Sequence, residues 1–224
     1  MSGRHTFEAA LQALQDDVLV LGDRVENALL DSVDALKARD FEASRAIIAE
    51  DKVIDAMRYK IESDALTLIA TQQPMAGDMR MIAAALIIAN ELERIGDYAK
   101  SIGKINIKIG AEPLMKPLID IPRMAEIGQD MVHRSLEAFV GRNLDLAYAV
   151  IADDEQVDAL YDQVYSEVLT LLFSDVRKIR QGNMLVMAAH NLERAADRAT
   201  NICERVIYCV TGKLVDTGWE NDVP

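Results

Sequence analysis

The sequence predicts an all-α protein built as two tandem three-helix bundles, six helices in all, that are related by an internal duplication with a pseudo-two-fold relation. Three observations indicate this fold. Apolar residues recur every three or four positions over long stretches, as on the buried face of a helix. Only five prolines interrupt 224 residues, so helices can run for many turns. The two halves also share a motif about a hundred residues apart.

The apolar spacing places the six helices in order. In the first helix, for example, Phe7, Leu11, Leu14 and Val18 follow this spacing. The fourth begins near Pro122, because proline suits the first turn of a helix. The predicted helices span residues 7–37, 40–71, 76–109, 122–139, 144–177 and 184–212.

A cluster of helix breakers, Gly110, Pro113, Pro117 and Pro122, marks the boundary between the two bundles. We therefore expect one three-helix repeat over residues 1–112, a second over residues 122–214, and a tail over residues 215–224.

The two halves can be aligned residue by residue. Residues 46–57 match residues 149–160 at an offset of 103, and residues 92–99 match residues 192–199 at an offset of 100. The difference of three residues falls between the second and third helix of each half, where loops tolerate insertions. The alignment therefore supports the helix assignment.

Charge and composition narrow the function. The net charge of −13, from 24 basic and 37 acidic residues, opposes nucleic acid or anionic lipid as a principal partner and favours cations or basic protein surfaces.

Cys203 and Cys209 lie about 9 Å apart along one helix, too far for a disulfide. The start of the chain has no apolar signal core, and the longest apolar run, residues 81–89, cannot span a membrane. We expect a soluble, cytoplasmic protein.

Pairs of acids four residues apart carry the candidate chemistry. Such residues share one helix face, where like charges repel unless a proton or cation lies between them. The chain has seven pairs, close to the number of about six expected by chance, so their number proves nothing. Four of them, however, stand at equivalent places in the two repeats. These four are Asp51/Asp55, Glu93/Asp97, Asp154/Asp158 and Glu193/Asp197.

These eight carboxylates favour a hard or borderline metal ion, whereas the alternative is a set of solvated stripes on an acidic bundle. The Glu-x-x-His element of di-iron bundles is absent. His190, one turn before Glu193, is either a ligand of the second site or an ordinary satisfied histidine. No nucleophile motif or phosphate-binding glycine loop is present, so we expect a non-enzyme with no catalytic residues.

Four segments together resemble the PhoU family of phosphate-transport regulators. These are Gln73–Arg80, Leu92–Asp97, Leu192–Asp197 and Asn201–Gly212. The resemblance implies a six-helix protein, often a homodimer, in which the motif acids hold iron, manganese, magnesium or zinc. It also implies negative control of phosphate uptake and of the phosphate-starvation response. The implied partners are the ATPase of a phosphate ABC transporter and a membrane sensor histidine kinase, so that contact with the membrane is indirect.

By this resemblance the metal ligands are Asp51, Asp55, Glu93, Asp97, Asp154, Asp158, Glu193 and Asp197. Ala195 and Ala196 replace the isoleucine and glycine that are common in the family, so we expect closer helix packing, and firmer metal binding, in the first half. The alternatives are a metal-dependent or metal-storing bundle and a purely structural helical module.

Overall fold

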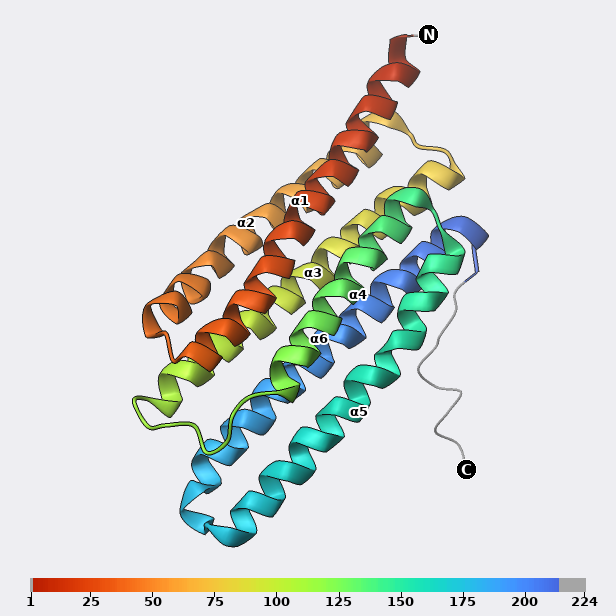
Figure 1. Ribbon diagram of the computed structural model, residues 1–224. Coiled ribbons are helices and arrows are strands. Elements are labelled where there is room, and N and C mark those ends of the chain that lie inside the picture. The colour runs from red at the N-terminus through yellow and green to blue at the C-terminus, as the bar shows by residue number, and fades with distance from the viewer. Residues whose placement is uncertain (1, 214–224) are drawn as a thin grey trace.

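The computed structural model describes residues 2–213, and it confirms the predicted fold class (Figure 1). Within this range the chain forms six α-helices, one short 3-10 turn and no strand. The tail predicted over residues 215–224 lies outside the described residues. The helices are α1 (Ser2–Ala38), α2 (Phe41–Gln72), α3 (Ala76–Ile109), α4 (Asp120–Gly141), α5 (Leu144–Ser174) and α6 (Ile179–Thr211).

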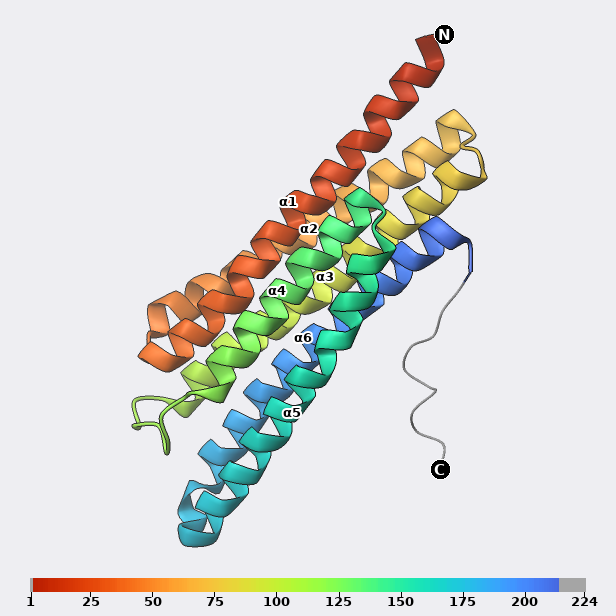
Figure 2. The ribbon, with the colours of Figure 1, turned by 45° about the vertical axis from the view of Figure 1, so that its right-hand side comes forward.

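The helices form two antiparallel bundles, α1–α3 and α4–α6, which lie side by side (Figures 1 and 2). Contacts between the bundles run from α3 to α6 and from α1 to α4. In the described part of the chain, α2 contacts only α1 and α3, and α5 contacts only α4, α6 and the 3-10 turn. The outer helices α2 and α5 therefore each leave one face free for a ligand or a partner.

The turn between the first two helices of each bundle repeats the same local chemistry. Arg39 and Arg142 adopt left-handed backbone angles, with φ of 59° and 49°, and end α1 and α4. The following residues, Asp40 and Asn143, accept hydrogen bonds from backbone N–H groups of the next helix and so cap its start. The duplication thus extends to the turns.

Two equivalent arginines fasten the central helices α3 and α6 to each other. Arg80, near the start of α3, donates to the carbonyl of Cys209 at 3.4 Å. Arg180, near the start of α6, donates to the carbonyl of Lys108 at 3.1 Å. Both carbonyls belong to the last turn of the opposite helix, where a cation is favourable. These reciprocal contacts express the pseudo-two-fold relation.

Five predicted helix boundaries were wrong by two to five residues; one of them is the end of α4, at Gly141 rather than residue 139. α1 begins at Ser2 rather than Phe7, and α4 begins at Asp120 rather than Pro122, although Pro122 still lies in the first turn. α5 ends at Ser174 rather than residue 177, because Asp175 accepts from the N–H of Arg177 and starts a 3-10 turn, Val176–Lys178.

The start of α6 differed by five residues, as the start of α1 did, since it lies at Ile179 rather than Met184. The polar residues before Met184 hid the helical spacing. Gly182 lies inside the helix because a Cβ there would come within 2.9 Å of Val168 on α5. A glycine that looks like a loop residue in the sequence serves helix packing instead.

Candidate functional site

The predicted acids lie on two helix pairs, one in each bundle. Asp51 and Asp55 come from α2, opposite Glu93 and Asp97 of α3. Close packing brings the two helices together at Gly96, where a Cβ would lie 3.1 Å from the side chain of Ile54. The second half repeats the arrangement with α5 and α6.

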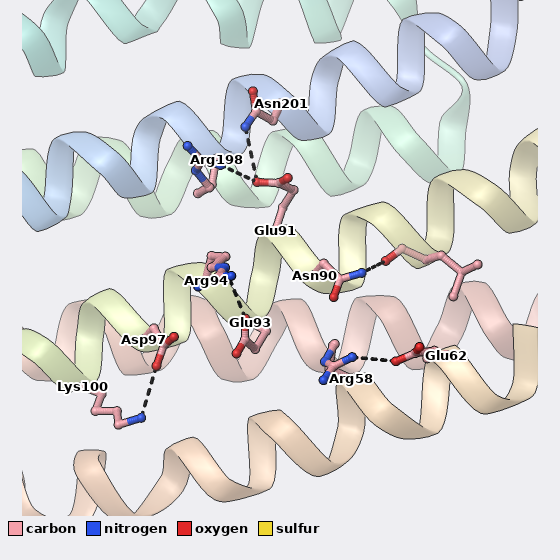
Figure 3. Close-up of polar contacts among 11 residues, drawn as sticks. Arg58, Glu62, Asn90, Glu91, Glu93, Arg94, Asp97, Lys100, Arg198 and Asn201 are labelled. Carbon is pink, nitrogen blue, oxygen red and sulfur yellow. Dashed lines mark hydrogen bonds and ion pairs between the residues drawn. The ribbon is translucent and has the colours of Figure 1, made fainter.

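In the first half, a lysine neutralises two of the four acids. The Nζ atom of Lys100 lies 2.6 Å from Asp51 Oδ2 and 3.2 Å from Asp97 Oδ1, and Figure 3 shows its contact with Asp97. Asp51 is buried, so its carboxylate needs this partner. The hydrogen bond to Asp51, and a further one to Asp97, raise the pKa of Lys100 and keep it charged. Lys100 therefore acts as a built-in cation.

Glu93 lies beside this pair and keeps an excess of negative charge around it. Burial raises its pKa, and the charges of Asp97 and Asp55 add to the effect. Its nearest cation is Arg94, whose Nε lies 3.9 Å from Glu93 Oε2 (Figure 3). Since both Asp55 and Asp97 act on Glu93, the acids of α2 and α3 face one another as the spacing predicted.

In the second half, the same four acids lack the lysine. Thr200 stands at the position that corresponds to Lys100, and its hydroxyl donates to the carbonyl of Asp197 at 2.8 Å. Burial raises the pKa of Asp154 to about 7, with further contributions from the charges of Asp158, Asp197 and Glu193. The Oδ1 atom of Asp154 is buried without a hydrogen-bond partner. The negative charge of Asp154 is therefore not balanced by any group of the site.

Asp158 is more exposed than Asp154. Burial also raises the pKa of Asp158, followed by the charges of Glu193 and Asp197. The Nδ1 atom of His190 lies 2.6 Å from Glu193 Oε2, and its ring packs 5.9 Å from that of Tyr161. His190 is thus satisfied by Glu193 and remains next to the acids.

The donor set fits a cation better in the second half than in the first. In the described range, residues 2–213, no group of three or more His, Cys, Asp and Glu side chains is arranged to hold a metal ion. The unpartnered Asp154 oxygen and the raised pKa of Asp154 nevertheless indicate that this carboxylate lacks a positive neighbour. In the first half, Lys100 already supplies that charge. The metal site stays a prediction.

Sequence reasoning missed Lys100 and a polar junction between the bundles. Glu91 accepts from Arg198 and Asn201 of α6 at 3.2 and 3.3 Å (Figure 3), and Asn191 donates to Ser101 at 3.1 Å. Positions 91 and 191 are equivalent in the two repeats and both carry a polar residue. This repeated polar position was the sequence signal that could have revealed the junction. Each contacts the opposite central helix, so the junction follows the same pseudo-two-fold relation.

Within residues 2–213, no helix has both the length and the apolar character that crossing a membrane requires.

Comparisons with known proteins agree on one family. The family model described as PhoU domain matches residues 18–105 and 121–206, one match per bundle. Among curated proteins, the "phosphate-specific transport system accessory protein PhoU homolog" of Clostridium acetobutylicum is 37% identical over 95% of this chain and 98% of its own length. The homolog of Caulobacter vibrioides is also 37% identical, over 93% of this chain and 91% of its own.

Solved structures show the same similarity in three dimensions. The phosphate transport system regulatory protein PhoU from Streptococcus pneumoniae superposes with a TM-score of 0.87 at 30% identity, over 94% of this chain and 99% of that one. PhoU from Pseudomonas aeruginosa gives a TM-score of 0.86 at 31% identity, over 92% and 100%.

Proposed function

Because this chain belongs to the PhoU family, we propose that it is a cytoplasmic, non-enzymatic negative regulator of phosphate uptake and of phosphate-starvation signalling. The observation that carries the proposal is the full-length similarity to proteins named as accessory or regulatory components of phosphate transport, with both repeats present. Regulation by an accessory protein needs contact surfaces rather than a reaction centre. The free outer faces of α2 and α5 suit that role.

The proposed partners are the ATPase of a phosphate ABC transporter and a sensor histidine kinase, and the protein is expected to form a homodimer. The strongly acidic surface, with a net charge of −13, favours basic partner surfaces. In this proposal the protein is an adaptor that reaches its membrane partners from the cytoplasm.

A divalent or trivalent metal ion on the motif acids is the second component of the proposal. Asp154, Asp158, Glu193 and Asp197 would hold it in the second half, and Asp51, Asp55, Glu93 and Asp97 in the first. Bound metal would supply positive charge to crowded carboxylates and fix the relative positions of the outer and central helices. The orphaned oxygen of Asp154 supports a cation in the second half.

The regulatory role is tested in a strain that lacks this protein and carries a phosphate-starvation reporter. Wild-type protein should silence the reporter in high phosphate. Reporter expression that is the same with and without the protein, in both high and low phosphate, would contradict the proposal. Pull-down from cells in both conditions would identify the partners.

The metal component is tested separately with purified protein prepared without a chelator. Manganese should raise the melting temperature, because a ligand that binds only the folded state stabilises it. Glu193→Ala with Asp197→Ala should reduce the rise, because only the site of the first half then remains. Glu126→Ala with Asp130→Ala, an acid pair at the same spacing on α4, is the matched control and should leave it intact. An unchanged melting curve for the wild type would remove the metal from the proposal and leave the regulatory role standing.

A further inference from the structure

The hairpin end between α5 and α6 exposes large apolar side chains. Phe173 at the end of α5 is 91% exposed, Val176 in the 3-10 turn 67%, and Ile179 at the start of α6 62%. They follow one another along the turn and are far more exposed than Leu169, at 40%, farther back on α5. The apolar surface is therefore concentrated at the turn of the hairpin.

Basic residues alternate with these apolar residues. Arg177, Lys178 and Arg180 are all exposed. Arg177 pairs with Asp175, with Nε 2.9 Å from Oδ1. Lys178 and Arg180 make no ion pair with a carboxylate in the part of the chain that the structure describes. In a chain with a net charge of −13, this end is a local exception.

The equivalent end of the first bundle lacks the combination. Its turn contains Gln73, Pro74 and Met75. Met75 is 72% exposed, but residues 73–79 contain no basic residue, whereas the second hairpin end has Arg177 and Lys178 in its turn. The two hairpin ends lie at opposite ends of the molecule (Figures 1 and 2). The feature is thus specific to the second bundle and is not a consequence of the duplication.

We propose that this hairpin end, defined by Phe173, Val176, Arg177, Lys178, Ile179 and Arg180, docks on the surface of an anionic lipid bilayer. Exposed apolar residues can enter the boundary between headgroups and acyl chains, while lysine and arginine contact anionic headgroups. Exposed apolar and basic side chains at one end of an otherwise acidic molecule complement an anionic lipid surface.

The charge distribution sets the orientation of this contact. The acidic sides of the bundles are repelled by anionic lipid, whereas the basic hairpin end is attracted to it. The molecule therefore stands end-on and keeps the acidic faces of both helix pairs accessible to partners. The proposal is independent of the regulatory function, which does not require direct lipid contact.

The test is co-sedimentation of the full chain with vesicles of phosphatidylcholine alone and of phosphatidylcholine mixed with phosphatidylglycerol. Wild-type protein should sediment with the anionic vesicles only, and less as salt rises. Phe173→Asp should lower partitioning by about tenfold or more, because it removes buried apolar area and adds a negative charge. Lys178→Gln with Arg180→Gln should weaken binding and its salt dependence.

Met75→Asp, at the opposite hairpin end, is the matched control and should bind like wild type. All these side chains are exposed, and thermal unfolding checks that each variant is folded. Absence of wild-type binding to protein-free anionic vesicles overturns the proposal, as does an equal loss for Met75→Asp and Phe173→Asp. If Phe173→Asp instead abolishes binding to a protein partner without lipid present, while the vesicles bind nothing, the hairpin end is a protein interface and the lipid assignment is wrong.

Discussion

The two halves place the same four acids on equivalent helices and differ in how they balance the negative charge. In the first half, the Lys100 ammonium lies 2.6 Å from the buried Asp51 and also contacts Asp97. In the second half, Thr200 replaces the lysine, and Asp154 keeps a buried oxygen without a partner and a pKa of about 7. One residue thus separates a buried aspartate with its own cation, Asp51, from an equivalent aspartate without one, Asp154.

A repeated motif therefore does not imply that the two copies have the same electrostatic properties. The sequence favoured the first half for metal binding because Gly96 permits closer helix packing than Ala196. The electrostatics favour the second half, since an ion there would not have to displace an ammonium group. Helix packing and charge therefore predict opposite orders of metal affinity for the two halves, and experiments can separate the two effects.

The largest expected effect is on stability, through Asp154→Asn. A carboxyl whose pKa is about 7 in the folded state and near 3.8 when unfolded binds its proton more tightly in the folded state, so stability falls as pH rises from about 4 to about 7 and stays low above that. The full shift corresponds to about 4 kcal/mol. Water and side-chain rotation relieve part of it, so we expect about 2 kcal/mol at pH 8, or a rise in melting temperature of roughly 4–8 °C.

Melting curves from pH 4 to pH 8 in a chelator measure this effect. The Asp154→Asn variant should be more stable than the wild type at pH 8 and no more stable near pH 4. Asp51→Asn is the counterpart in the first half and should have the opposite sign at pH 8, because it removes the ion pair with Lys100. If both variants stabilise equally, the proposed difference between the halves does not exist.

The second effect is on metal affinity, through an exchange of the two equivalent residues. Lys100→Thr should strengthen manganese binding by the first half, and Thr200→Lys should weaken binding by the second, each by about tenfold, or about 1.4 kcal/mol. Titration calorimetry of the two variants measures the change. Lys104→Thr, which removes an exposed lysine one turn farther along α3, should change nothing.

Equal affinities of the wild type and both exchange variants would show that Lys100 does not compete with metal. A loss of binding with Lys100→Thr would show instead that the lysine organises the acids for an ion.

The sequence predicted the fold and the acid positions because both depend on spacing along single helices. Helical periodicity located every helix boundary within three residues except the starts of α1 and α6, and the offsets revealed the repeat. Lys100 could be seen three residues after Asp97, but its contact with Asp51 depends on how α2 is aligned against α3, which spacing within one helix does not define. The burial of Asp154 likewise arises from packing between helices. The start of α6 was missed because polar residues and Gly182 interrupted the apolar pattern.

The smallest expected effect is on the free energy of unfolding, at the helix contact that led us to predict firmer metal binding in the first half. At Gly96 a Cβ would lie 3.1 Å from the Ile54 side chain, whereas in the second half the equivalent residues are Ala196 and Val157, both fully buried. The extra methyl on the small residue is thus matched by one methylene fewer on the facing residue. We expect Gly96→Ala to lower the free energy of unfolding by about 1 kcal/mol, because overpacking outweighs the gain in helix propensity.

In an Ile54→Val background, the same Gly96→Ala change should be neutral or stabilising, because the shorter side chain leaves room for the methyl group. Denaturant unfolding of the four proteins in this double-mutant cycle gives the coupling energy directly. A coupling near zero would mean that α2 and α3 adjust freely at this point. Helix packing at this position would then not distinguish the two halves. The difference in charge between residues 100 and 200 would remain as the explanation for different metal binding by the halves.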